Sequence, residues 1–192
     1  MSIFDLIFIA VFFIRVITLV ATAVAAIRGR RRRALGILRV LGVFIAAYLA
    51  VVIVVSLASP LRLLSLNEPQ CFDDWCIAVE QVARTPAGAE VPYDVTLRLS
   101  SRARRVAQRE TGGSVYVLDD RGRRYQPADD PQAIPLNVLL QPGESVTATR
   151  RFTLPAEAHN PGLVFAHGRF PGMFIIGNDE SLFHKPTVIR FP

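Results

Sequence analysis

The sequence predicts a two-helix transmembrane hairpin followed by an all-β antiparallel sandwich. Two long stretches near the start are almost free of charge, an arginine-rich segment separates them, and the remainder alternates apolar and polar residues between turn signals. The chain has 192 residues, of which 51% are hydrophobic. Its mean hydropathy of +0.34 is too apolar for an ordinary soluble domain. We therefore expect part of the chain to lie in lipid.

The two apolar stretches each have the length of a membrane span. Residues 3–27 contain only Asp5 and Arg15 as charged residues, and residues 40–58 contain none. Both lengths suit a hydrocarbon core of about 30 Å at about 1.5 Å per helical residue. A cleaved signal peptide is the competing interpretation of the first stretch. It lacks a cationic start, however, and a second span follows directly.

The segment between the spans determines the expected orientation. Residues 28–33 hold five Arg in six positions. Cytoplasmic loops are enriched in Lys and Arg, so this loop is predicted to be cytoplasmic and both termini extracytoplasmic. Residues 60–70 then form a juxtamembrane linker, and residues 71–192 an extracytoplasmic domain at a bacterial inner membrane. The loop either binds anionic lipid headgroups or only sets topology.

Small residues recur every four positions on both predicted helices. Thr18, Thr22 and Ala26 do so on the first, and Gly42, Ala46 and Ala50 on the second. Such faces permit close helix packing. We expect the two helices to pack through them, with pairing to another subunit as the alternative.

Arg15 is the least expected residue in the first span. It lies near the predicted middle of the bilayer, where insertion of a cation costs about 2.5 to 3.5 kcal/mol. The second span offers no carboxylate, and Asp5 is about 15 Å away along the helix. Arg15 either snorkels toward water or pairs with an acid on a partner membrane protein or a second copy of this chain. The contact set is predicted as Arg15, Thr18 and Thr22.

The rest of the chain has the pattern of antiparallel strands. Residues 93–100 and 146–154 alternate apolar and polar side chains, and an Asp/Gly turn at 119–122 joins two further strands. Further strands are expected at 75–83, 163–166, 173–176 and 187–191. No stretch has the period of a long amphipathic helix.

Four motifs resemble those of bacterial membrane-anchored extracytoplasmic immunoglobulin-like domains of unknown function. They are the strand at 93–100, the L-D-D-x-G-x-x-Y hairpin at 118–125, the L-x-P-G-E-S-V turn at 140–146 and the F-T-L-P strand end at 152–155. The resemblance implies an immunoglobulin-like sandwich over roughly residues 72–168. It implies almost nothing about activity.

The two cysteines, Cys71 and Cys76, lie in the predicted oxidising compartment. On a continuous strand they would be too far apart to bond. A turn at Asp73-Asp74 brings them together, so a disulfide is the favoured interpretation. Free thiols, a redox couple and half of a metal site are the alternatives.

Two clusters could in principle bind a ligand. His159, His167 and His184 match no metal-ligand spacing, and we predict no metal site. Residues 98–124 carry eight Arg against three acids. If they share a face, a weak anionic-ligand patch would consist of Arg102, Arg104, Arg105, Arg121, Arg123 and Arg124.

Charge and motifs exclude several functions. Residues 71–192 carry 14 basic and 14 acidic side chains, so nucleic-acid binding is not expected. No nucleophile elbow, zinc-protease motif, phosphate loop or dinucleotide fingerprint occurs, so we predict no enzyme, no catalytic residue and no cofactor. The expected function is a non-catalytic interaction or scaffolding module that binds another envelope or membrane protein. The alternatives are a ligand or metal carrier and an accessory subunit that contacts a membrane complex through the hairpin.

Overall fold

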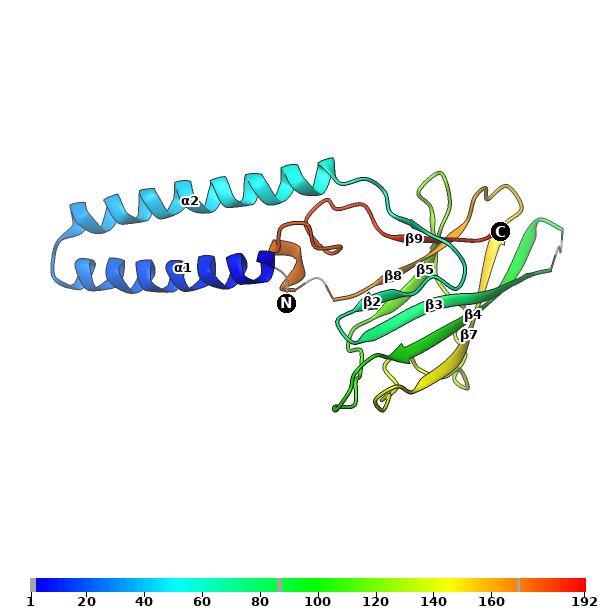
Figure 1. Ribbon diagram of the computed structural model, residues 1–192. Coiled ribbons are helices and arrows are strands. Elements are labelled where there is room, and N and C mark those ends of the chain that lie inside the picture. Colours follow the sequence, from blue (N-terminus) through cyan, green and yellow to red (C-terminus); the bar gives the residue numbers. More distant parts are fainter. Residues whose placement is uncertain (1–2, 86–87, 169) are drawn as a thin grey trace. The chain divides into compact units, whose positions relative to one another are not determined.

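The computed structural model describes residues 3–85, 88–168 and 170–192, and it contains two long helices followed by a β-sandwich (Figure 1). The helices are α1 (Ile3–Ile27) and α2 (Arg31–Ala58), and a short 3-10 helix, η1, covers Gly172–Phe174. The strands are β1 (Leu63–Leu64), β2 (Gln70–Phe72), β3 (Trp75–Arg84), β4 (Glu90–Ser101), β5 (Ser114–Leu118), β6 (Arg124–Tyr125), β7 (Ser145–Pro155), β8 (Gly162–Ala166) and β9 (Val188–Arg190).

The chain divides into two compact units. The helical unit comprises Met1–Pro60 with Arg169–Lys185, and the sandwich unit comprises Leu61–Gly168 with Pro186–Pro192. Both helices are long and apolar enough to cross a membrane by length and composition. A membrane span is therefore compatible with the helices, and the sandwich forms a separate core.

A three-residue turn joins the helices. The amide of Arg30 donates to the carbonyl of Ala25 at 2.9 Å, and the amide of Gly29 donates to that of Ala26 at 3.0 Å. This pair of bonds is a Schellman motif, which needs a left-handed residue, and Gly29 supplies it with φ 72°. The second helix begins at Arg31, not near residue 40 as the loss of charge suggested. Arginine is a good helix former, so the helix extends through the charged segment.

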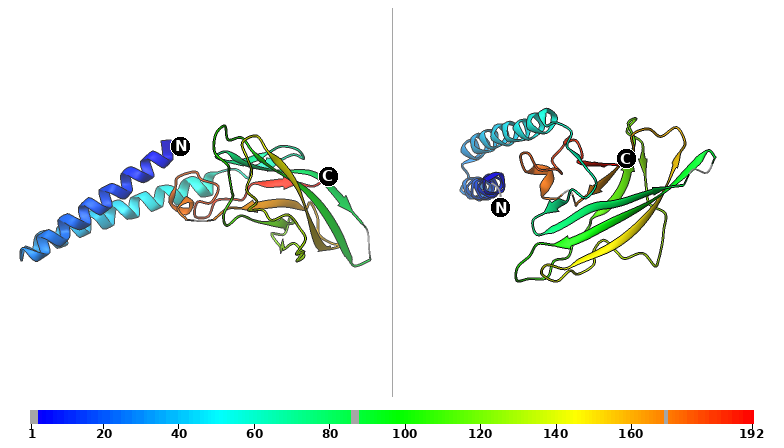
Figure 2. Two further views of the ribbon diagram at one scale, coloured as in Figure 1. Left: turned by 90° about the horizontal axis from the view of Figure 1, so that it is seen from below. Right: turned by 45° about the vertical axis from the view of Figure 1, so that its right-hand side comes forward.

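On α2 the helices pack through a different face from the one predicted, whereas on α1 the predicted Thr22 is buried and Ala26 is exposed. The buried residues are Val11, Thr22 and Ala25 on α1, and Ala34, Leu41, Tyr48, Val52 and Ser56 on α2. The helices run side by side in Figure 1 and lie next to each other in the left view of Figure 2. Gly42, Ala46 and Ala50 are exposed, and a Cβ added at Gly42 would meet nothing within 4 Å. Because the turn is short, the residues of α1 and α2 that lie opposite each other differ from those predicted. As a result, α2 packs larger side chains such as Leu41 and Tyr48 against α1.

The sandwich consists of two hydrogen-bonded sheets. One has the strand order β1-β9-β8-β5-β6 and the other β2-β3-β4-β7. Its pairs are antiparallel except for β1 and β9, which run parallel. Side chains from both sheets share one core, including Val95 and Phe152 from one sheet and Leu163 from the other, each fully buried. The predicted alternation along β4 and β7 is confirmed.

Two boundaries differ from the sequence prediction. The expected linker at residues 60–70 contains β1, and Leu64 of that strand is buried in the sandwich core. The expected strand at 173–176 is absent, since residues 172–174 form η1, and this segment belongs to the helical unit. Both differences arise from contacts with residues distant in sequence, which local alternation cannot reveal. The observed architecture is a β-sandwich of two sheets after two apolar helices.

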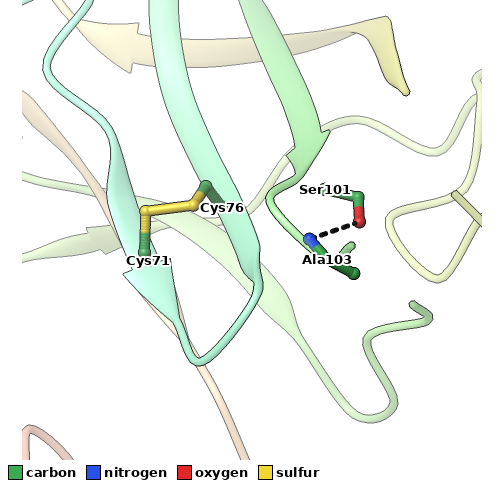
Figure 3. Close-up of a disulfide and its surroundings, with 4 residues drawn as sticks. All are labelled: Cys71, Cys76, Ser101 and Ala103. Atoms are coloured by element: carbon green, nitrogen blue, oxygen red, sulfur yellow. Dashed lines mark hydrogen bonds between the residues drawn. A yellow bond between two sulfur atoms is a disulfide. The ribbon is translucent and has the colours of Figure 1, made fainter. Parts of the chain in front are cut away.

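A disulfide joins Cys71 and Cys76 across a tight hairpin between β2 and β3 (Figure 3). The two cysteines are directly paired in the register, with Phe72 opposite Trp75 one step closer to the turn. Asp73 adopts a left-handed backbone with φ 52°, which a two-residue hairpin turn requires. The predicted bend at Asp73-Asp74 therefore places the two sulfur atoms within bonding distance.

We predict that this bond is present in the isolated protein. Denaturing alkylation should add no label without reductant and two labels after reduction, as measured by intact mass. The Cys71→Ser variant, which leaves one cysteine, should take up one label without reductant. Closing so small a loop stabilises the fold by roughly 2 kcal/mol in the chain-entropy model, so the double serine variant should unfold more easily. Labelling of the unreduced wild-type protein would contradict the bond.

Candidate functional site

In the helical unit, Arg15 of α1 lies over the ring of Tyr48 of α2. The guanidinium carbon is 5.6 Å from the ring centre, within the range of a cation–π contact. Two buried nitrogen atoms of Arg15, Nε and Nη2, have no hydrogen-bond acceptor among the described residues. An aromatic ring can hold a cation where no carboxylate is present. The signal for this contact was Tyr48 itself, the one polar side chain between Val40 and Val55.

Tyr48 also binds a distant part of the chain. Its hydroxyl donates a hydrogen bond to the carbonyl of Phe174 at 2.7 Å. Ile176 packs against the cluster formed by Val11, Tyr48 and Val52. The segment that carries η1 is thus attached to the helices by a hydrogen bond and an apolar contact, and the sequence pattern contained no indication of this.

Thr18 and Thr22, predicted with Arg15 as contact residues, bond within their own helix. The Thr18 hydroxyl donates to the carbonyl of Ile14 at 2.7 Å, and that of Thr22 donates to the carbonyl of Thr18 at 2.8 Å. Thr22 is buried and Thr18 is half-buried. Their hydroxyls are therefore satisfied without a partner protein.

The six arginines of the predicted anionic-ligand patch do not share one site. Arg102, Arg104 and Arg105 follow β4, beside the start of β7, where the amide of Ser101 donates to the carbonyl of Glu144. Arg121, Arg123 and Arg124 lie in the β5–β6 hairpin, where Arg123 pairs with Glu157 just after the end of β7. The 11-residue length of β7 separates the two groups. Neighbours in sequence were placed at opposite ends of the sandwich by the intervening strand β5.

Asp119 organises the second arginine group. Its side chain is fully shielded from solvent and accepts hydrogen bonds from Arg123 Nε at 2.6 Å and from the Tyr125 hydroxyl at 3.1 Å. The amides of Arg121 and Arg123 donate to its other oxygen. Burial on its own raises the pKa of Asp119, but the hydrogen bonds from Arg123 and Tyr125 outweigh it and hold the pKa below its usual value. Arg123 is therefore a structural cation, not one available to a ligand.

The remaining arginines of the predicted patch differ in their surroundings. Arg124 lies 4.9 Å from the centre of the Tyr116 ring. Arg102, Arg104 and Arg105 are exposed in one loop, together with Val106, which is 67% exposed. Arg121 and Arg124 of the β5–β6 hairpin are exposed as well, but that hairpin also contains the buried carboxylate of Asp119.

The three histidines lie in different places. His159 precedes β8 and His167 follows it, while His184 belongs to the helical unit. Among the described residues, no group of three or more His, Cys, Asp or Glu side chains is arranged to hold a metal ion. The histidines thus offer no shared coordination site in that part of the chain.

His167 nevertheless has a defined environment. Its Nδ1 atom is 2.7 Å from Oε1 of Glu110, a buried carboxylate, and its ring stacks on Phe72 at 5.2 Å. Phe72 adjoins Cys71, whose sulfur is oxidised in the disulfide and cannot act as a nucleophile. This arrangement anchors the end of β8 to the disulfide hairpin. Sequence reasoning missed it because Glu110 and His167 are far apart in the chain.

No protein-family model and no curated protein match this chain. Solved structures with some likeness to it include an uncharacterized β-sandwich protein from Clostridium difficile 630, with 9% identity over 70% of this chain and 96% of that chain and a TM-score of 0.44. The yjhA protein from Bacillus subtilis has 10% identity over 67% of this chain and 99% of that one, with a TM-score of 0.45. A conserved hypothetical protein from Bacillus anthracis has 13% identity over 54% and 88%, with a TM-score of 0.40. Likenesses of this degree say nothing about activity or partners.

The buried carboxylate of Asp119 predicts a specific pH dependence. We expect Asp119→Asn to lower the unfolding free energy by about 1 to 3 kcal/mol at neutral pH, since the charge-assisted bonds are lost. A folded-state pKa below the unfolded value near 3.9 stabilises the protein above that pH, and the benefit disappears as the pH falls through the folded pKa. The difference between wild type and variant should therefore shrink in acid.

Urea unfolding in detergent, followed by Trp75 fluorescence, measures both free energies. The matched control is Asp94→Asn, which removes the exposed cross-strand pair with Arg151 and should cost less than about 1 kcal/mol. The assigned role would be contradicted if the difference in unfolding free energy between wild type and Asp119→Asn were the same at neutral pH and at about pH 3.

Proposed function

We propose that this chain is a membrane-anchored, non-catalytic interaction module of a bacterial cell envelope. The hairpin of α1 and α2 crosses the cytoplasmic membrane, and the sandwich lies on the extracytoplasmic side, where it binds another envelope component. The observation that carries the proposal is the hairpin, because its two helices bury one face each and leave their other apolar side chains uncovered.

Lipid is the natural cover for those side chains. On α1 the exposed set includes Phe12 at 53%, Phe13 at 58% and Ile17 at 66%. Complete transfer of a side chain of this kind from water to an apolar environment is favourable by about 1.5 to 3 kcal/mol, and these side chains would gain roughly the exposed share of it. Residues of α1 are also buried in the contact with α2, which favours a retained helix over a removed leader. These features support an anchor formed by both helices.

Charge and redox chemistry support the orientation. The turn between the helices carries Arg28 and Arg30, and α2 begins with three further arginines at 31–33 and no acid in its first turn. The positive-inside rule places such a turn in the cytoplasm. The disulfide between Cys71 and Cys76 suits an oxidising compartment on the other side. Two independent features therefore support the same topology.

The exposed loop that contains Arg102, Arg104 and Arg105 is the surface of the sandwich that best suits an anionic partner.

A second candidate function is that of an accessory subunit that contacts a membrane complex through Arg15. The unpaired Nε and Nη2 atoms of Arg15 favour it, because a partner acceptor would satisfy both. The contact with Tyr48 already offsets part of the cost of the cation, so we place the main interaction on the sandwich.

Reporter fusions test this orientation. Alkaline phosphatase folds only in an oxidising compartment, so a fusion after Pro192 should be active and one after Arg33 inactive. Green fluorescent protein at the same two positions serves as the matched control and should give the reverse pattern. A fluorescent, phosphatase-inactive fusion at Pro192 would overturn the proposal.

A further inference from the structure

The connection between β8 and β9 is much longer than its geometry requires. The two strands are antiparallel neighbours, with Leu163 opposite Ile189. Two to five residues usually join such strands. Here the chain instead leaves the sandwich unit after Gly168 and returns to it at Pro186, and the intervening residues belong to the helical unit. Loops of this length in compact domains are usually either functional or linker segments.

In this segment, residues 170–185, one run of backbone carbonyls is fully paired. Five consecutive carbonyls, those of residues 171–175, each accept a hydrogen bond. The donors are the amides of Phe174, Ile175 and Leu182, the Tyr48 hydroxyl and the Ser181 hydroxyl. Irregular backbone is tolerated at membrane depth only where it is buried in protein or lines a water-filled cavity. The paired carbonyls belong to the part of the segment that packs against the helices through Tyr48, so this part suits such a position, and the rest of the segment suits the membrane surface.

The segment contacts α2 well inside its apolar stretch. Tyr48 lies ten residues before the end of the helix at Ala58, and Val52 lies six residues before it. At about 1.5 Å per residue these positions are about 15 and 9 Å from the helix end. Half of a hydrocarbon core is about 15 Å. In a spanning hairpin, the contact extends from near the middle of the bilayer into the outer leaflet, on the side away from the arginine turn (Figure 1).

Two aromatic side chains of the segment face outward. Phe170 is 78% exposed and Phe183 is 66% exposed. Phe183 also adopts a left-handed backbone with φ 64°, which is unfavourable for a bulky residue. Such strain persists where the surroundings require it and is frequent at binding sites. An environment that receives the ring would account for both the exposure and the conformation.

Resting on the proposed membrane anchor, we propose that residues 170–185 form a lipid-binding loop that inserts into the outer leaflet beside the hairpin. Phe170 and Phe183 bind the boundary between headgroups and acyl chains. His184 and Lys185 directly follow Phe183 and lie at the headgroup level, as basic residues next to interfacial aromatics do. The continuity of the segment with the apolar surface of the hairpin favours lipid over a protein partner.

Tryptophan fluorescence in proteoliposomes tests the loop. Phe183→Trp and Phe170→Trp are each made in a Trp75→Phe background. Trp75 is buried and its Nε1 atom has no acceptor among the described residues, so phenylalanine there breaks no hydrogen bond. Phe13→Trp on α1 reports the anchor, and His159→Trp, at an exposed position of the sandwich, reports access to water. The vesicles contain phosphatidylcholine brominated near the glycerol end of the acyl chains, and iodide is the aqueous quencher.

We expect both loop tryptophans to lose more than half of their fluorescence to the brominated lipid and to resist iodide, as the Phe13→Trp reporter should. Quenching of the loop tryptophans by iodide, with the Phe13→Trp reporter still quenched by lipid, would overturn the loop and leave the anchor intact. Loop tryptophans quenched by neither reagent would indicate cover by protein and would also overturn it. Loss of lipid quenching in the Phe13→Trp variant would reject the anchor itself.

Discussion

Two helices that pack against each other can each cover only one side, and beyond the arginine-rich start of α2 both α1 and α2 are apolar on most sides. The buried face runs from Val11 to Ala25 on α1 and from Ala34 to Ser56 on α2, while large side chains such as Phe13 and Ile17 point away from it. Burial of apolar surface is the dominant favourable term in folding, so an exposed apolar surface of this extent requires a non-aqueous environment or a partner to cover it. If that environment is a lipid bilayer, it explains together where the arginines, the disulfide and the loop at 170–185 lie.

The need to avoid water-free, unpaired polar groups also accounts for the contacts that polar side chains make in the helical unit. Arg15 lies over the Tyr48 ring, the threonine hydroxyls bond to carbonyls of their own helix, and the Tyr48 hydroxyl bonds to Phe174. In the sandwich, by contrast, exposed cations such as Arg104 stand in the solvent, and the fully buried carboxylate of Asp119 has several donors. Most of these groups have partners within the chain, although Arg15 Nε and Nη2 have no acceptor among the described residues.

Features that depend on local order were accessible from the sequence. The period-two alternation predicted β4 and β7, the lack of charge predicted both helices, and the Asp73-Asp74 turn predicted the Cys71–Cys76 pair. Features that depend on distant contacts were not. The start of α2 at Arg31, the strand at Leu63–Leu64 and the separation of the two arginine groups follow from helix propensity, a parallel pairing with β9 and the run of β5. An immunoglobulin-like topology remains a prediction within the broader β-sandwich.

The central claim is that lipid covers the hairpin, and washing isolated membranes in alkaline carbonate tests it most directly. This treatment strips proteins held only by surface charge or by other proteins, whereas a spanning hairpin stays in the bilayer. The account predicts that the whole chain remains in the membrane pellet and leaves it only in detergent. Release of the intact chain into the carbonate supernatant would contradict it.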